Sequence, residues 1–172
     1  MKPEIFMDDF ERTELSDAHY AAIGRLLTFA SRFEAVAKGI SLLVGLKKKR
    51  SLIDSDSALN EFIERLRKMP LARHLSDLGL DEGSAGMVLL AARRARNEIA
   101  HTLTIGLDRC LDRLSREQRV EFVQRLEELA VSLAEGDRVI SYLASVSTSE
   151  HLPSPNFLNE YPVRVAAWVC EL

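Results

Sequence analysis

The chain has 172 residues, of which 47% are hydrophobic and 28% charged, a composition typical of a protein that folds around its own core. Its formal net charge is −3 at pH 7, from 26 acidic and 23 basic side chains. Proteins that grip nucleic acid along their whole surface carry a basic excess, so this balance excludes a histone-like or polybasic binder and confines any nucleic-acid contact to a local patch.

The cysteines and the N-terminal segment carry no sign of secretion or membrane insertion. Cys110 and Cys170 lack metal-ligand spacing and lie among apolar residues, where a reduced thiol packs as a small hydrophobe. The opening residues, MKPEIFMDDFERTE, are acidic and have no apolar signal-peptide core. No run reaches the roughly 18 to 20 apolar residues that a membrane span needs. We therefore expect a cytoplasmic protein with no membrane contact.

The first expected helix begins near Ser16, which can cap its N-terminus, and ends near Gly45. The cationic run KKKR at 47–50 follows directly and suits the negative end of the helix dipole. Such a run is more often a solvated helix end, although it can also neutralise phosphates along an RNA path. Apolar residues recur at helical spacing as Ile23, Leu27, Ala30, Phe33, Ala37, Ile40 and Val44.

Shorter helices are expected in the middle of the chain. A second helix carries an apolar face over 59–66 and ends or kinks at Pro70. A short helical piece, LARHLSDLG, then stops at Gly79, a usual position for a C-terminal glycine. The third major helix opens at Asp81 and is expected to continue as far as Leu114.

The fourth long helix begins at the tetrapeptide SREQ, residues 115–118. This sequence fits a capping box, in which the serine and the glutamine bond each other's free backbone amides. Gly136 and Asp137 are expected to weaken the helix midway. Its apolar stripe consists of Phe122, Leu126, Leu129, Leu133, Ile140 and Leu143.

Four principal helices with short connections predict an all-α fold, an antiparallel four-helix bundle with short accessory helices. We expect a single helical domain spanning residues 1–172, with 1–15 and 148–172 as peripheral segments. After two prolines, the C-terminal residues form a short helix or an extended piece. The apolar residues around Trp168 belong either to the core or to a dimer contact.

The stretch LLAARRARNEIAHTL, residues 89–103, places three arginines, an asparagine and a histidine in an otherwise apolar helix. At about 100° per residue, Arg93, Asn97 and His101 form a row at intervals of four, opposite the apolar side. Arg96 lies about 60° from Arg93, so its long side chain can swing toward that row. Guanidinium groups bind phosphate through paired hydrogen bonds, and histidine moves protons near neutral pH. These residue types suit phosphodiester chemistry.

The hexapeptide RNEIAH, from Arg96 to His101, resembles the signature of the HEPN superfamily: arginine, a polar residue, three further residues and histidine. The resemblance implies a commonly dimeric helical bundle. Many members are metal-independent ribonucleases of toxin–antitoxin, abortive-infection or RNA-processing systems. By this resemblance, Arg96 and His101 are the catalytic pair and Asn97 is their polar companion. Two copies of the motif meet across a dimer to form one RNA cleft, where the RNA 2′-hydroxyl attacks the adjacent phosphate.

The resemblance leads us to expect a metal-independent endoribonuclease or RNA-binding protein in defence, stress response or RNA turnover. In this role Arg96 polarises the scissile phosphate and His101 acts as acid or base. Asn97 orients one of them, and Arg93 assists as a phosphate anchor. The expected partners are RNA, a second copy of the chain, and an antitoxin or regulatory protein.

The alternative is a non-catalytic helical module that regulates or binds other proteins. In that case the arginines form surface ion pairs with acidic neighbours such as Glu98. Neither alternative needs a cofactor or a metal. The histidines lack metal-ligand spacing, and the sequence carries no P-loop, dinucleotide fingerprint or nucleophile elbow.

Overall fold

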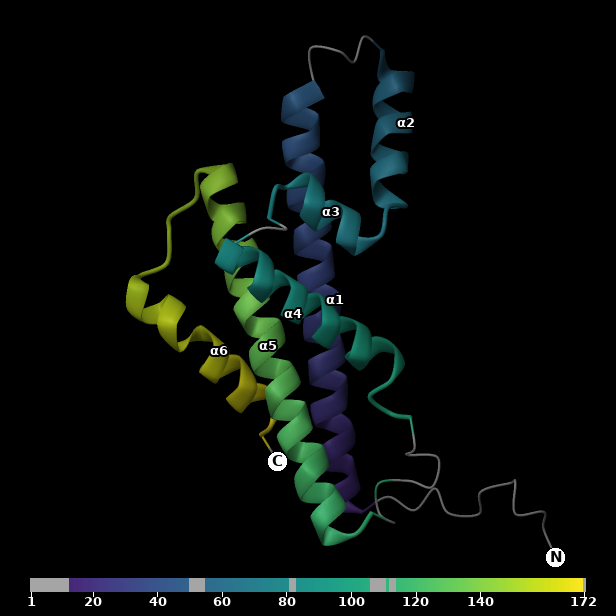
Figure 1. The fold of residues 1–172 in the computed structure, drawn as a ribbon, viewed down its shortest axis with the longest axis vertical. Helices are drawn as coiled ribbons and strands as arrows, with labels where there is room; N and C mark the ends of the chain where they lie inside the picture. Colours follow the sequence, from purple (N-terminus) through teal and green to yellow (C-terminus); the bar gives the residue numbers. More distant parts are fainter. Residues whose placement is uncertain (1–12, 50–54, 81–82, 106–110, 112–113, 172) are drawn as a thin grey trace, which may run out of the picture.

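The computed structural model describes residues 13–49, 55–80, 83–105, 111 and 114–171, and every regular element within them is a helix (Figure 1). The predicted all-α class is therefore confirmed. Within the described residues, no helix is both long enough and apolar enough to cross a membrane. The helices are α1 (Glu14–Lys49), α2 (Asp56–Arg67), α3 (Leu71–Asp77), α4 (Gly83–His101), α5 (Arg116–Thr148) and α6 (Pro155–Val169).

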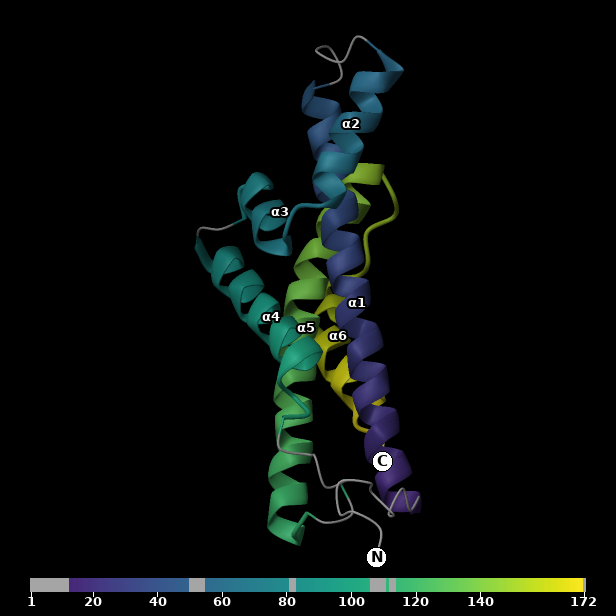
Figure 2. The same ribbon diagram turned by 90° about the vertical axis from the view of Figure 1, so that its right-hand side faces the viewer.

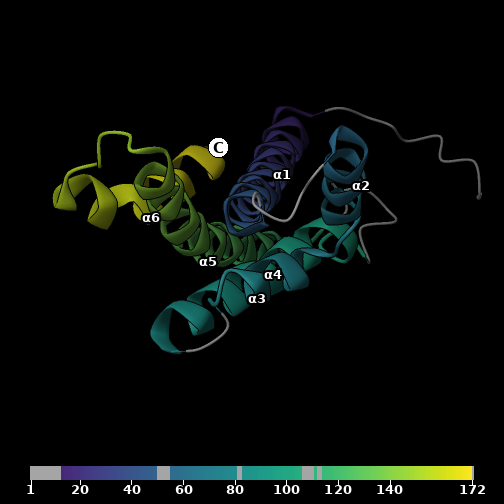
Figure 3. The same ribbon diagram turned by 90° about the horizontal axis from the view of Figure 1, so that it is seen from above.

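The two longest helices, α1 and α5, lie side by side and run in the same direction (Figure 1, Figure 2). α4 crosses this pair obliquely on one face, and α6 lies along the flank of α5 (Figure 3). α6 runs obliquely back beside α5, whereas α4 crosses α1 and α5 at a wide angle, so the predicted antiparallel arrangement does not describe α1, α4 and α5 (Figure 1). α5 is the central helix, since it contacts α1, α4 and α6.

α2 and α3 pack on the C-terminal part of α1 (Figure 1). α2 approaches α1 closely at Gly45, where an added Cβ atom would lie 3.4 Å from both Phe62 Cζ and Leu66 Cδ1. α3 contacts α1 and α4 and ends, as predicted, just before Gly79. The backbone φ of Gly79 is +70°, a conformation that favours glycine at a helix C-terminus.

α6 carries part of the core, although the sequence places residues 148–172 at the periphery. Its Val165 and Val169 are buried together with core residues of α1, α4 and α5, because one face of α6 is apolar. Trp168, three residues after Val165, lies at the edge of this face and is 46% exposed. The other segment expected at the periphery, 1–15, lies outside the described residues up to position 12. Of the four principal helices expected, α2 is thus replaced by α6 beside α5.

Reciprocal hydrogen bonds cap the N-termini of α1 and α5. The backbone N–H of Ser16 donates to Thr13 Oγ1, and the N–H of Thr13 donates to Ser16 Oγ, both at 3.1 Å. Thr13 therefore caps α1, and the predicted cap Ser16 is instead buried in its first turn. The predicted capping box of α5 is confirmed: Gln118 N–H donates to Ser115 Oγ at 3.2 Å, and Ser115 N–H donates to Gln118 Oε1 at 2.9 Å.

α4 ends at His101, earlier than the predicted limit at Leu114. The backbone N–H groups of Thr102 and Leu103 both donate to the carbonyl oxygen of Glu98 at 2.8 Å, which closes the last turn. Residues 106–110 and 112–113 of the expected extension lie outside the described residues. The helix terminus, and with it His101, is therefore set by local hydrogen bonds.

α4 approaches α5 closely at Gly136. A Cβ atom added to Gly136 would overlap the methyl group of Ala92 and lie 3.3 Å from Phe33 Cε2. α5 is nevertheless continuous through Gly136 and Asp137, and both residues are buried. The prediction that this pair weakens the helix is wrong, because the missing side chain is what lets α4 approach.

Asp137, the neighbour of Gly136, is fully buried and joins three helices. Its carboxylate forms an ion pair with Arg32 of α1 and accepts hydrogen bonds from Ser141 Oγ at 3.3 Å and from Tyr161 Oη of α6 at 2.6 Å. Burial, and then the bond to Asp137, raises the pKa of the Tyr161 phenol. A buried carboxylate needs such partners, so this network fixes α6 against α1 and α5.

His74 is buried in α3 and is 1% exposed. Neither ring nitrogen makes a well-formed hydrogen bond to a described residue, although the carbonyl groups of Leu66 and Met69 lie nearby. Burial lowers the pKa of the imidazole, and the charge of Lys38 on α1 acts in the same direction, while Asp77 of α3 opposes it. The folded protein therefore favours neutral His74.

We predict that Gly136→Ala lowers the free energy of unfolding by about 1 to 3 kcal/mol, because overpacking outweighs the better helix propensity of alanine. Gly24→Ala is the matched control. Gly24 is also in a helix, but an added Cβ there meets nothing within 4 Å, so the control should gain up to about 1 kcal/mol. Urea unfolding measures both. Equal stabilisation of the two variants would contradict the close approach of α4 to α5.

We predict that stability falls as the pH drops below about 6.5, because protonation favours the unfolded state, in which His74 has its ordinary pKa. His74→Leu should abolish this step. The comparison is urea unfolding at about pH 8 and about pH 5.5, with exposed His151→Gln as control. An unchanged acid-induced loss in His74→Leu would show that another group is responsible.

Candidate functional site

α4 separates an apolar face from a polar face, as its sequence predicts. Ala92, Ala95 and Ile99 are buried among residues of the other long helices. On the opposite side, Asn97 and His101 are exposed and Arg93 is half-buried. The seating of the apolar face on the core therefore turns the predicted polar row toward solvent.

Arg96 does not share the solvent-facing side with that row but is turned toward α1. Its guanidinium forms an ion pair with the carboxylate of Glu34, and the two side chains are 24% and 20% exposed. Arg96 Nη1 also donates to Asn97 Oδ1 at 3.1 Å. Lys38 Nζ lies 2.6 Å from the other oxygen of Glu34. Arg96 is thus held between a carboxylate and an amide, and Glu34 is shared by two cations.

The two cations set the charge state of Glu34. Burial by itself would raise the pKa of the carboxyl, but the hydrogen bond from Lys38 and the charges of Arg96 and Lys38 outweigh it and lower the pKa. Glu34 is therefore ionised at neutral pH. Its carboxylate occupies Arg96 as a phosphate oxygen would, since both are oxyanions that a guanidinium binds.

His101 is exposed at the last position of α4. It follows Arg96 by five residues, which corresponds to about 140° around a helix. Arg96 points to α1, so the two side chains leave α4 in different directions. A single chain does not bring the predicted catalytic pair to one point.

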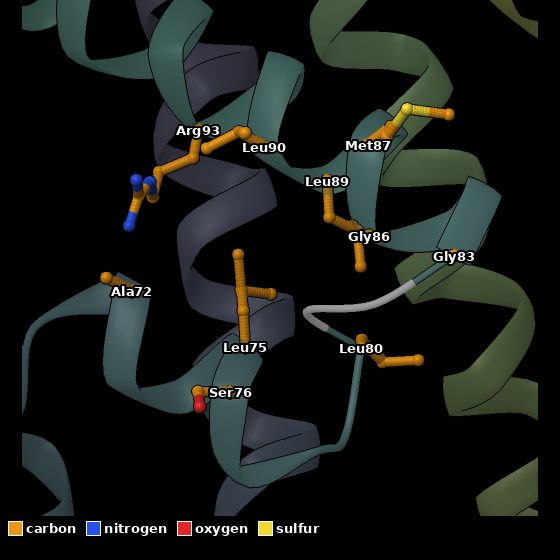
Figure 4. A pocket seen from close by; sticks show the side chains of 10 residues that line it. All are labelled: Ala72, Leu75, Ser76, Leu80, Gly83, Gly86, Met87, Leu89, Leu90 and Arg93. Atoms are coloured by element: carbon orange, nitrogen blue, oxygen red, sulfur yellow. The ribbon is translucent and has the colours of Figure 1, made fainter.

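Arg93 borders a pocket of about 400 Å³ between α3 and α4. The pocket is walled mainly by apolar side chains, including Leu75, Leu80 and Leu90 (Figure 4). In Figure 4 the Arg93 side chain lies on the same side of the pocket as Ala72. Asn97 is one turn further along α4, so Arg93 is the member of the polar row that lies at the edge of this apolar pocket.

Glu98 does not pair with the arginines of its own helix. Arg125 of α5 donates two hydrogen bonds to it, from Nε at 2.7 Å and from Nη2 at 2.6 Å. These bonds, opposed by burial, lower the pKa of the Glu98 carboxyl. The pair ties the C-terminal half of α4 to α5. Neither Arg125 nor Glu34 could be predicted as a partner from the sequence, because neither is near residues 93–101 in the chain.

Among the described residues, no group of three histidine, cysteine, aspartate or glutamate side chains is arranged to hold a metal ion. Cys110 lies outside these residues, and burial raises the pKa of the half-buried Cys170 thiol. No family model, curated protein or solved structure matches the chain. The described side chains offer an exposed imidazole at the end of α4 and, on a different side of the helix, an arginine whose anion partner is a carboxylate.

We predict that Glu34→Gln lowers the free energy of unfolding by about 1 kcal/mol at pH 7, since it removes the shared partner of Arg96 and Lys38. The lowered pKa of Glu34 means that this contribution is lost as the pH falls below the ordinary value of 4.5. Glu64→Gln, which breaks the more exposed pair with Arg67, is the control and should change stability less. Equal effects of the two variants at pH 7 would argue against a structural role for the shared carboxylate.

Proposed function

We propose that the chain is a HEPN-like protein that binds RNA and cleaves it without a metal, as a cytoplasmic homodimer acting in defence, stress response or RNA turnover. The observation that carries the proposal is the arrangement on α4. Arg96 and Asn97 are hydrogen-bonded to each other, and exposed His101 lies one turn beyond Asn97. Cognate antitoxins or regulatory proteins are further partners in this proposal.

The helix arrangement is compatible with a HEPN-like four-helix bundle. α1 and α5 lie side by side, α4 crosses them and α6 runs obliquely back beside α5, with α5 in contact with the remaining three (Figure 1). In this proposal α2 and α3 are the accessory helices. They leave the C-terminal half of α4, which holds the motif, uncovered in Figure 2.

The side chains of Arg96 and His101 point away from each other, and this is the chemical reason for proposing a homodimer. About 140° separates the two side chains around α4, so one copy cannot direct both at the same phosphate. A second copy related by a two-fold axis places its own motif opposite the first. His101 of one protomer then completes the site with Arg96 of the partner subunit.

The proposed reaction is an internal transesterification. The imidazole of His101 takes the proton of the RNA 2′-hydroxyl, the 2′-oxygen forms a bond to the adjacent phosphorus, and the bond from phosphorus to the 5′-oxygen breaks. The proton passes to the leaving 5′-oxygen, which gives a 2′,3′-cyclic phosphate and a 5′-hydroxyl. Arg96 exchanges Glu34 for the phosphate and stabilises the added negative charge. Arg93 holds a neighbouring phosphate.

We predict that the purified protein cleaves RNA in EDTA and that His101→Ala and Arg96→Ala each lose about 100-fold or more in rate. Glu34→Gln is the matched control, because it breaks the same ion pair as Arg96→Ala but keeps the guanidinium. It should retain or increase the cleavage rate. The measurements are gel-based cleavage, mapping of cyclic-phosphate ends and a circular-dichroism check of each variant.

A mixture of the two inactive variants tests the shared site. In an equal mixture, half of the dimers combine one chain of each kind, and one of their two sites keeps both catalytic residues. We expect about a quarter of the wild-type rate to return. Cleavage by single variants at the wild-type rate, or failure of the wild type on a broad RNA panel, would remove the catalytic proposal. No recovery in the mixture would remove the shared site.

A second candidate is a non-catalytic helical interaction module. The observation that favours it is that Arg96 is already neutralised by Glu34, while Glu98 is taken by Arg125. Under this alternative Arg96→Ala and Glu34→Gln reduce stability to a similar extent, and neither His101→Ala nor Arg96→Ala changes RNA binding. Thermal unfolding together with an RNA-binding titration separates the two candidates.

A further inference from the structure

A second pocket, of about 400 Å³, opens where α1, α2 and α3 meet, away from the polar row of α4. Its volume lies within the range of about 300 to 1,000 Å³ that is usual for small-molecule sites. α2 stands beside the C-terminal part of α1, and α3 packs on α1 (Figure 1). The wall of the pocket therefore combines residues that the sequence separates into three helices.

Positive charge concentrates around this pocket. Lys48 and Lys49 of α1, Arg65 of α2 and Arg73 of α3 line it together with one carboxylate, Asp77, so the lining carries a formal charge of +3. The whole chain carries −3. The cations are therefore gathered here against the overall balance, which favours an anionic ligand.

Most of these cations lack an acidic partner. Arg73 Nε lies 3.1 Å from the carboxylate of Asp77. Among the described residues, no carboxylate pairs with Lys48, Lys49 or Arg65. The ammonium of Lys49 and the guanidinium of Arg65 each lie 5.4 Å from the centre of the Phe62 ring, in cation–π contact. The ring holds these two cations at the pocket and leaves their charge unneutralised.

The first cation of the run at 47–50 has a different role. Lys47 Nζ donates to the carbonyl oxygen of Ser147 at 2.9 Å and so ties α1 to the end of α5. Arg50 lies outside the described residues. Lys48 and Lys49 are exposed in the last turn of α1, as expected of a solvated helix end, and they also line the pocket.

Apolar side chains line the same pocket. Val44 and Leu66 contribute to it together with Met69. Leu66 is buried, and the other two are half-buried. A ligand that fits this combination has a phosphate-like anionic end and a less polar end. Inorganic phosphate alone would leave the apolar lining unused.

We propose that this pocket binds a small phosphate ester of nucleotide size. Its phosphate groups lie among Lys48, Lys49 and Arg65, and its less polar part contacts Val44, Leu66 and Met69. The proposal does not depend on ribonuclease activity, because α4 contributes no residue to the pocket. Such a ligand also bridges α1 and α2, so its binding stabilises the folded protein by mass action.

The test is isothermal titration of the full chain with ADP, pyrophosphate and adenosine at low salt. We expect ADP to bind more tightly than pyrophosphate, adenosine to bind weakly, and added salt to weaken ADP binding. Lys48→Gln and Arg65→Gln should each weaken ADP binding about tenfold or more. Arg116→Gln makes the same charge change at the start of α5, at the far end of the molecule from α2, and should leave the affinity unchanged (Figure 1).

Three results would overturn the proposal. The first is no binding of ADP or pyrophosphate at millimolar concentration. The second is an equal loss of affinity in Arg116→Gln and the two pocket variants, which would mean that only net charge matters. The third is adenosine binding as tightly as ADP. Lys48 is exposed, so loss of folding does not obscure Lys48→Gln.

Discussion

The close approach of α4 to α5 is the constraint on which the rest of the structure depends. It exists because Gly136 has no side chain where the methyl group of Ala92 and the ring of Phe33 meet α5. Any side chain at position 136 would push α4 outward from both α5 and α1. Glycine is usually a poor helix residue, but here its cost of about 1 kcal/mol is offset by contact among three helices.

The contact of Gly136 with Ala92 and Phe33 also positions the residues of the candidate site. Arg96 lies one turn beyond Ala92 on α4, and Glu34 follows Phe33 on α1, so seating Ala92 beside Phe33 also brings the guanidinium to the carboxylate. The same seating buries the apolar side of α4 and turns Asn97 toward solvent. The core thus positions Arg96 against Glu34, and under the proposed function a phosphate would have to displace that carboxylate.

Charged side chains away from the candidate site occur in two different settings. Asp137, next to the critical glycine, is buried and holds α6 through Tyr161 and α1 through Arg32. Among the residues that the structure describes, the cations at the junction of α1, α2 and α3 have no acidic partner except for Arg73, although the chain as a whole is acidic. The buried carboxylate of Asp137 is thus paired, whereas the cations proposed to hold a phosphate ester lie at an open surface.

The sequence by itself determined the helical class, the capping box at Ser115, the end of α3 before Gly79 and the polar side of α4, because each depends on residues within one or two turns. Only the tertiary structure decided that α6 rather than α2 lies beside α5, that Gly136 is a contact rather than a weak point, and that Arg96 pairs with Glu34. These outcomes depend on which distant side chains fit together, and apolar spacing along one helix gives its buried face without naming the partner that covers it.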